Sequence, residues 1–259
     1  MAGKGNENVT YVDKNGKRLD GRKVEELRPV KIEVGVLDRA DGSAYVEWGH
    51  NKAIAAVYGP REVLPKHMAN PYKAIMRVYY RMSPFSVPEH KRPAPGRREI
   101  EISKVMGEAL DAAVLTENFP QSQIEVYVEI LDADAGTRIT ALAAASAALA
   151  DAGIPMRDLV AGVSVGKAGG HIIADLTKAE EDAPDAVDIP IAILPSTKEV
   201  VLLQMDGILT KDEWKKAHEL AHKAAEQIYN KQKEALRTKY ETAEVEKTKT
   251  VEEKEEVVE

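Results

Sequence analysis

Residues 137–151 (TRITALAAASAALAD) constrain the fold of this chain more than any other segment. Seven of these fifteen residues are alanine, which has the highest helix propensity of all amino acids. Gly153 and Pro155 follow, and both are typical of positions just beyond the end of a helix. The sequence therefore predicts a helix from Thr137 to Asp151 whose small side chains allow it to pack closely on a β-sheet.

Strands are predicted on both sides of this helix, from alternating apolar residues or from short apolar runs between turn residues. These segments are Val30–Val36, Ser43–Trp48, Lys52–Tyr58, Ala74–Met82, Gln123–Leu131, Leu159–Val165, His171–Asp175, Val187–Leu194 and Val200–Gln204. Apolar residues at helical spacing predict two more helices, one ending before Pro120 and one from about Lys211 to Tyr240. Because strands and helices occur in blocks, the pattern predicts an α/β chain of the α+β two-layer sandwich type, as one domain or two similar halves.

The two ends differ in composition from the body. Residues 1–18 are mostly polar, and we expect a flexible segment there. Residues 241–259 contain eight Glu and three Lys, which is −5 of the net charge of −7, and they lack an apolar face. We expect this acidic tail to be disordered or a frayed helix. The predicted domain therefore spans residues 19–240.

The composition also limits the location of the protein. The sequence contains no cysteine, which excludes disulfides and zinc–thiolate sites. Residues 1–10 lack the apolar stretch of a secretory signal, and the least polar run, residues 139–150, is too short to cross a bilayer. We therefore expect a soluble, cytoplasmic protein with no membrane partner.

A basic segment lies within this acidic chain. Residues 66–104 contain nine Lys or Arg and three Glu. RNA binding needs a local basic patch that displaces counterions, not a protein that is basic as a whole. Such segments also occur on ordinary soluble surfaces, so this one leaves RNA binding open.

The first candidate site is the segment Asp134-Ala135-Gly136-Thr137-Arg138, between a predicted strand and a predicted helix. The start of a helix presents unpaired N–H groups and a partial positive charge, which favour an anion. Gly136 permits close approach, Thr137 offers a hydroxyl, and Arg138 suits phosphate oxygens. A capped helix with a surface arginine explains the spacing equally well.

The second candidate combines Lys91-Arg92 with Arg97-Arg98, just before the predicted helix that ends ahead of Pro120. Arginines at a helix start oppose the helix dipole, which favours acidic residues there. A bound phosphate backbone would explain them. Ion pairs with Glu99, Glu101 or a neighbouring subunit are the alternative.

The third candidate is a group of acids between two apolar strands: Asp175, Glu180, Glu181, Asp182, Asp185 and Asp188. Two carboxylates around a turn can hold Mg²⁺ or transfer a proton. A solvated acidic loop is the plainer interpretation for most of them. Asp188 is different, because it lies within a predicted strand, where a carboxylate needs a partner.

Taken together, the motifs resemble the RNase PH family, in the form of the catalytic ring subunits of the archaeal exosome. The resemblance covers about residues 19–240. The motifs that carry it, in order, are Leu19-Asp20-Gly21-Arg22, residues 53–60 (AIAAVYGP), residues 95–101 (PGRREIE), residues 133–138 (ADAGTR), residues 150–159 (ADAGIPMRDL) and Val187-Asp188-Ile189-Pro190.

The resemblance implies an RNase PH-like fold of paired β-α units with left-handed crossovers. It also implies a hexameric ring, in which three copies of this chain alternate with three copies of a related inactive subunit. RNA-binding cap proteins would cover the ring, and single-stranded RNA would pass through its channel.

The resemblance further implies roles for individual residues. Gly136, Thr137 and Arg138 match the phosphate-binding loop, and Arg97 and Arg98 match the pair that grips the RNA end and the phosphate. Asp182 and Asp188 match the catalytic aspartates, which could also hold Mg²⁺. Ala183-Pro184 replace a bulkier residue of relatives. Lys66, with Lys91 and Arg92, is expected to contact RNA.

The implied activity is phosphate-dependent 3′→5′ exoribonuclease action that releases nucleoside 5′-diphosphates and is reversible to RNA tail synthesis. Inorganic phosphate would be the co-substrate. The alternatives are a homohexameric RNase PH that trims tRNA 3′ ends, a non-catalytic RNA-binding ring subunit and a hydrolytic nuclease.

Overall fold

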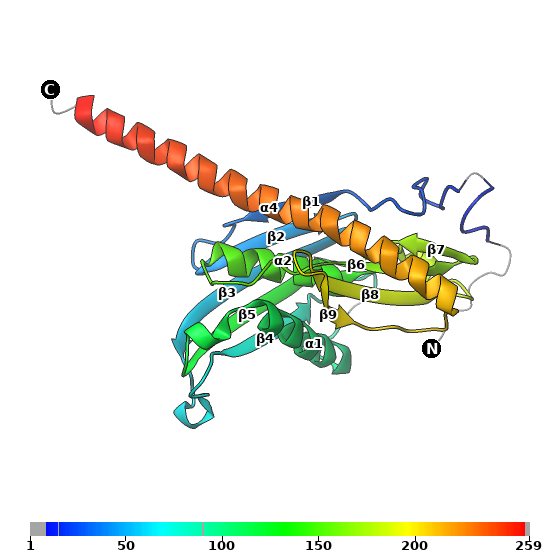
Figure 1. Ribbon diagram of the computed structural model, residues 1–259, viewed down its shortest axis with the longest axis horizontal. Coiled ribbons are helices and arrows are strands. Elements are labelled where there is room, and N and C mark those ends of the chain that lie inside the picture. The colour runs from blue at the N-terminus through cyan, green and yellow to red at the C-terminus, as the bar shows by residue number, and fades with distance from the viewer. Residues whose placement is uncertain (1–8, 15, 90, 257–259) are drawn as a thin grey trace.

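The computed structural model describes residues 9–14, 16–89 and 91–256, with side chains as far as residue 241. Its strands form a five-stranded and a four-stranded sheet. Helices α1, α2 and α4 pack against these sheets (Figure 1). The predicted mixed α/β class is therefore confirmed.

The five-stranded sheet has the order β1-β2-β3-β5-β4. Its strands are β1 (Val30–Val34), β2 (Gly42–Trp48), β3 (Asn51–Glu62), β4 (Ile75–Met82) and β5 (Ser122–Asp132). Neighbours are antiparallel except β4 and β5, which are parallel and are joined through α1 (Arg97–Ala113). The left-handed sense implied for such crossovers stays a prediction. Two short 3₁₀ turns, η1 (Lys66–Met68) and η2 (Thr116–Asn118), lie in the connections.

The four-stranded sheet has the order β7-β6-β8-β9 and is antiparallel throughout. Its strands are β6 (Ala161–Ala168), β7 (His171–Ala174), β8 (Val187–Leu194) and β9 (Glu199–Leu203). A one-turn helix, α3 (Lys178–Glu181), joins β7 to β8. The sequence pattern did not predict it, because four residues are too few to show helical periodicity.

Helix α2 (Thr137–Asp151) has the predicted bounds and contacts strands of both sheets: β2, β3 and β5 of one, β6 and β8 of the other. Nearly all its residues are buried. Its alanines permit this double contact. A methyl group added at Gly42 of β2 would lie only 2.2 Å from the backbone nitrogen of Ala152, which shows how closely the two backbones approach.

Helix α4 runs from Lys211 to Glu256 and packs on β1, β6, β7 and β8. It does not end near Tyr240 as the sequence predicted (Figure 1). Residues 241–256 contain no glycine or proline and are rich in Glu and Lys, which favour the helical backbone even without an apolar face. Residues 257–259, also part of the predicted tail, lie outside the described residues.

The described part of the N-terminal segment is docked, whereas the sequence suggested flexibility. Tyr11 and Val12 are buried in a small cluster with Ala168 and Ile173. Arg18 forms a buried ion pair with Glu180 at 2.5 Å. Residues 1–8 of the predicted flexible segment lie outside the described residues.

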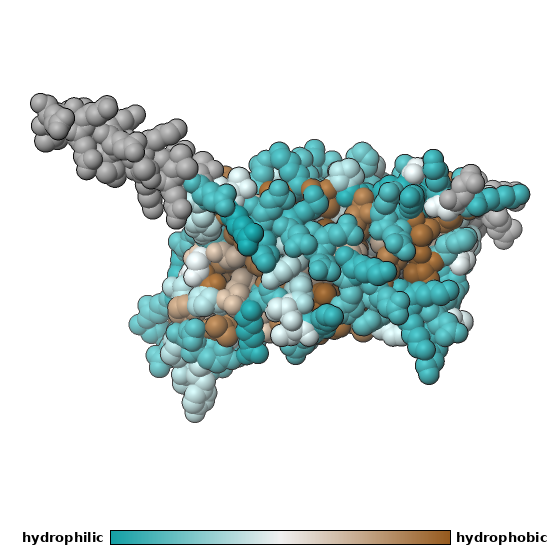
Figure 2. All heavy atoms as spheres, turned by 45° about the horizontal axis from the view of Figure 1, so that its top comes forward, coloured by the Kyte–Doolittle hydropathy of each residue, from teal (hydrophilic) through white to brown (hydrophobic). Residues whose placement is uncertain are grey.

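The surface is mostly hydrophilic, with small scattered hydrophobic groups on the face that Figure 2 shows. Among the described residues, no helix combines the length and the apolar character needed to span a bilayer.

Replacement of Gly42 by alanine tests the close packing of α2. We expect Gly42→Ala to lower the free energy of unfolding by about 1–3 kcal/mol, because the methyl group meets backbone atoms that cannot yield locally. Urea unfolding of the purified chain measures the change. The matched control is Gly107→Ala in α1, where the nearest atom lies 3.7 Å away and helix propensity predicts a gain of about 0.5–1 kcal/mol. Equal changes in the free energy of unfolding at Gly42 and Gly107 would contradict the close packing of β2 against the end of α2.

Candidate active site

The start of α2 follows a turn with a left-handed backbone. Gly136 is its N-cap, with φ 66° and ψ 17°, and the preceding Ala135 has φ 57°. The Tyr80 hydroxyl of β4 donates a hydrogen bond of 3.0 Å to Thr137 Oγ1. Within the described part of the chain, the backbone N–H groups of Thr137 and Arg138 donate no hydrogen bond. The helix therefore presents free donors where the sequence predicted phosphate binding.

Arg138 lies in the first turn of α2 and is mostly buried. One of its terminal nitrogens is 3.5 Å from the carboxylate of Glu101. Its Nε is fully buried and has no hydrogen-bond partner among the described residues. An unpaired buried donor costs about 1–3 kcal/mol, so this N–H fits an anion that would accept its hydrogen bond.

Arg97 and Arg98 are the first two residues of α1 and are exposed. Neither has an ion pair or a hydrogen bond from its side chain to another described residue. The charge of Arg98 acts on both Glu181 and Asp188, which places it at the site.

The alternative explanation for these arginines, ion pairs with Glu99 and Glu101, is not seen among the described residues. Glu99 instead binds Lys91 and accepts a hydrogen bond from the Gly96 N–H as part of the α1 cap. Glu101 meets Arg138 and Gln204. The guanidinium groups of Arg97 and Arg98 are therefore available to a ligand.

Asp188 lies in β8, opposite Gly166 of β6. The Ser164 hydroxyl donates a short hydrogen bond to its carboxylate, which supplies the partner that an acid in a strand needs. Burial raises the pKa of Asp188 above its ordinary value, and Ser164, Arg138 and Arg98 only partly offset this effect. The charge of Arg138 acts on Asp188 as well, so two of the predicted groups meet here.

Asp182 is placed differently from Asp188. It is about half exposed and pairs with Lys178 at 2.7 Å. The neighbouring Glu181 lies inward instead, with only 22% of its side chain exposed. Burial and the charge of Asp188 raise the pKa of Glu181. The acid on which the charge of Asp188 acts is therefore Glu181, a residue that the sequence pattern did not separate from its acidic neighbours.

The other predicted RNA contacts are spread over two loops. Lys66, in the β3–β4 connection, is exposed and pairs with Glu62 at 2.6 Å. Arg92 is exposed, whereas the amine of Lys91 is bound to Glu99. The structure thus brings Arg98, Gly136, Arg138 and Asp188 together, but it gives Lys91 a structural partner.

Mg²⁺, predicted at Asp182 and Asp188, stays a prediction. Asp188 and Glu181 are the carboxylates at the site that could hold such a cation. Both present carboxylate oxygens, the donors that this cation prefers. Their mutual repulsion, seen in the raised pKa of Glu181, is the condition that a bound cation relieves. No group of three or more potential metal-binding side chains occurs among the residues with described positions.

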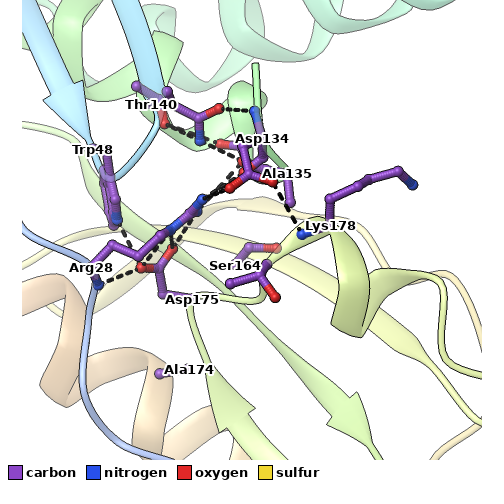
Figure 3. A network of polar contacts seen from close by, with 12 residues as sticks. Arg28, Trp48, Asp134, Ala135, Thr140, Ser164, Ala174, Asp175 and Lys178 are labelled. Atoms are coloured by element: carbon purple, nitrogen blue, oxygen red, sulfur yellow. Dashed lines mark hydrogen bonds and ion pairs between the residues drawn. The ribbon is translucent and has the colours of Figure 1, made fainter. Parts of the chain in front are cut away.

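Several residues that support the site were missed from the sequence. Arg28 and Asn51 bind the turn before α2. Arg28 is held by Asp175, which the sequence pattern named only as one of a group of acids (Figure 3). Tyr80 and Ser164 hold Thr137 and Asp188. Arg28 and Asn51 lie just outside the predicted strands, and the partners of all these residues are distant in sequence.

Comparisons with known proteins identify the family of the chain. The two domain models of the 3′ exoribonuclease family, that of RNase PH, match residues 26–155 and 158–224. The exosome complex component Rrp41 of Thermococcus kodakarensis is 58% identical over 234 residues, covering 90% of this chain and 94% of that protein. Rrp41 of Thermoplasma volcanium is 53% identical over 232 residues, covering 90% and 93%.

Two solved structures share the fold. The crystal structure of rice Rrp46 matches with a TM-score of 0.76 and 27% identity, covering 85% of this chain and all of that one. A structure of the Archaeoglobus fulgidus exosome with RNA bound to the active site matches with a TM-score of 0.72 and 23% identity, covering 84% and 93%. The chain belongs to the 3′ exoribonuclease family of RNase PH.

The raised pKa of Asp188 predicts a pH-dependent stability. A carboxyl whose pKa is raised on folding stabilises the protein below its unfolded pKa, and this contribution is lost as the pH rises through the folded pKa. Asp188→Asn is therefore expected to unfold at higher urea than the wild type at neutral pH, with a difference that shrinks as the pH falls.

Urea unfolding in metal-free buffer between about pH 4 and pH 8 measures this difference. Asp38→Asn, at an exposed position, is the control and should show no such trend. If the urea midpoints of Asp188→Asn and the wild type differ more as the pH falls, the raised pKa of Asp188 is contradicted.

Proposed function

We propose that this chain is a catalytic exosome subunit that removes nucleotides from the 3′ end of RNA by attack of inorganic phosphate. The observation that carries this proposal is the cluster of unpaired donors at the start of α2, next to Arg98 and facing two carboxylates. The exosome subunits of similar sequence support the assembly, and the family supports the exoribonuclease class.

The proposed reaction begins with phosphate held by the N–H groups of Thr137 and Arg138 and by the Arg138 guanidinium. An oxygen of this phosphate attacks the last phosphodiester in line, and the bond from phosphorus to the 3′ oxygen breaks. Arg97 and Arg98 offset the charge on the scissile group. Positioning and charge neutralisation supply most of the rate in such transfers.

The leaving 3′ oxygen takes a proton, which we assign to Asp182 by its match to the family motif. Its ion pair with Lys178 has to open for this step. Asp188, supported by Glu181, would hold Mg²⁺, which when bound neutralises charge on phosphoryl oxygens. The products are a nucleoside 5′-diphosphate and a shortened RNA. The reaction is reversible because the phosphodiester bond that breaks and the pyrophosphate bond that forms are close in free energy.

The proposed assembly is a hexameric ring with a related inactive subunit, cap proteins and single-stranded RNA in the channel, in the cytoplasm. An exposed apolar edge supports contact with another chain: Leu203 at the end of edge strand β9, and Met205 and Ile208 after it, are all at least half exposed. A homohexameric RNase PH is the alternative. The mass of the purified chain, alone and with its partners, separates the two.

Phosphate dependence tests the proposed chemistry. The assembled enzyme should degrade labelled single-stranded RNA only when phosphate is present and should release nucleoside 5′-diphosphates. Chromatography of the products with and without phosphate measures this. Monophosphates formed at equal rates in both buffers would identify a hydrolytic nuclease, and no degradation in either would favour a non-catalytic ring subunit.

Substitutions test the individual roles. We expect Arg98→Ala and Asp182→Ala each to lower kcat at least ~10²-fold, through lost charge stabilisation and lost proton transfer. Lys178→Ala is the matched control, because it frees Asp182 without removing the carboxylate and should leave kcat nearly unchanged. Near-normal turnover in Asp182→Ala, together with a large loss in Glu181→Gln, would move proton donation to Glu181.

A further inference from the structure

A buried polar network surrounds the turn that precedes α2 (Figure 3). At its centre is Arg28, which is 6% exposed and lies just before β1. Asp175, just after β7, is 2% exposed. The network therefore joins a segment next to the first sheet to one next to the second.

Asp175 anchors the Arg28 side chain. Its carboxylate accepts hydrogen bonds from the Arg28 backbone N–H at 2.7 Å and from Nη2 at 2.7 Å, and its Oδ2 accepts one from Trp48 Nε1 at 3.0 Å. Burial alone would raise the pKa of Asp175, but the hydrogen bonds and charge of Arg28 hold it below its ordinary value. The carboxylate is therefore ionised and fixes the orientation of the guanidinium.

The free side of this guanidinium faces the turn before α2. Nη1 donates a hydrogen bond of 2.5 Å to the carbonyl oxygen of Asp134, and Nη2 lies 3.5 Å from that of Ala135. Asn51 completes the arrangement from the start of β3: its Nδ2 donates to the Ala135 carbonyl at 2.5 Å, and its Oδ1 accepts from the Asp134 N–H at 2.6 Å.

These bonds hold the turn in an unfavourable conformation. Ala135 and Gly136 both have left-handed backbones, with φ 57° and 66°. A left-handed conformation is costly for alanine, because its Cβ approaches the following carbonyl. Both preceding carbonyls are bound by Arg28 and Asn51, whereas the N–H groups of Thr137 and Arg138 have no partner among the described residues.

We infer that Arg28 and Asn51 are positioning residues for the phosphate co-substrate, which they do not touch. They preset the turn at residues 134–136, so that the donors of α2 need no rearrangement when the anion binds. Preorganised donors bind an anion more tightly than donors that must be ordered first. The inference rests on the proposed phosphate-dependent function and adds the residues that set its phosphate affinity.

Arg22 provides a matched control within the same network. It also binds Asp175, through the carboxylate at 3.2 Å and the backbone oxygen at 3.1 Å. Its other partners are Asp20 and the carbonyl oxygen of Glu26, and it has no hydrogen bond to the turn before α2 among the described residues. Substitution of Arg22 therefore weakens the network without removing a bond to the turn, whereas substitution of Arg28 also removes bonds to the turn.

The test compares Arg28→Lys, Asn51→Ala and Arg22→Lys in the assembled enzyme, by initial rates at varied phosphate and at varied RNA. A lysine keeps the charge of Arg28 but cannot bind Asp175 and two carbonyls at once. We expect Arg28→Lys and Asn51→Ala to raise KM for phosphate about tenfold, with KM for RNA changed less than about twofold. Arg22→Lys should leave KM for phosphate within about twofold of the wild type.

An unchanged phosphate KM in Arg28→Lys, or a parallel rise of both KM values, overturns the inference. If Arg28→Lys fails to fold, as judged by circular dichroism and ring assembly, the KM values of Asn51→Ala for phosphate and for RNA decide instead. The wild type in the same experiment separates this inference from the proposed function. A wild-type rate that does not depend on phosphate would contradict the proposed function itself. A phosphate-dependent wild-type rate, with the KM for phosphate unchanged in both variants, would contradict only the positioning role.

Discussion

The buried ion pair between Arg28 and Asp175 is the interaction on which the rest of the site depends. It fixes a guanidinium between the two sheets and presents it to the turn before α2. That turn sets the direction of the helix start, and the helix start supplies the free donors. Charged partners removed from water at this position are costly unless every polar group is paired, and the network of Trp48, Arg22 and Asn51 supplies the pairing.

The second constraint is electrostatic. Arg98 and Arg138 lie at the starts of α1 and α2. Both charges act on Asp188, and the charge of Arg98 also acts on Glu181. Burial raises the pKa of both carboxyls, with Asp188 adding to the effect at Glu181 and Asp206 adding to it at Asp188, and the arginines only partly compensate. Such an arrangement suits a reaction in which a phosphate and an RNA end bring negative charge to the arginines while the carboxylates handle a proton or a cation.

Sequence patterns predicted the elements better than the contacts. Helix α2 and strand β8 have the predicted bounds, because long periodic segments carry a strong signal. The partner required by an acid in a strand was predicted for Asp188, and Ser164 supplies it. The Arg28–Asp175 pair joins residues 147 positions apart, and no local pattern encodes such a contact. Similarly, one turn of helix decides that Glu181 lies inward and Asp182 outward, which a run of acids does not reveal.

A crystal structure of the assembled enzyme soaked in orthophosphate tests the central claim most directly. The account predicts one phosphate at the start of α2, bound by the backbone N–H groups of Thr137 and Arg138 and by Nε of Arg138, with the turn at Ala135 and Gly136 unchanged. A phosphate bound elsewhere while this helix start binds none, or a turn that rebuilds to receive the anion, would contradict it.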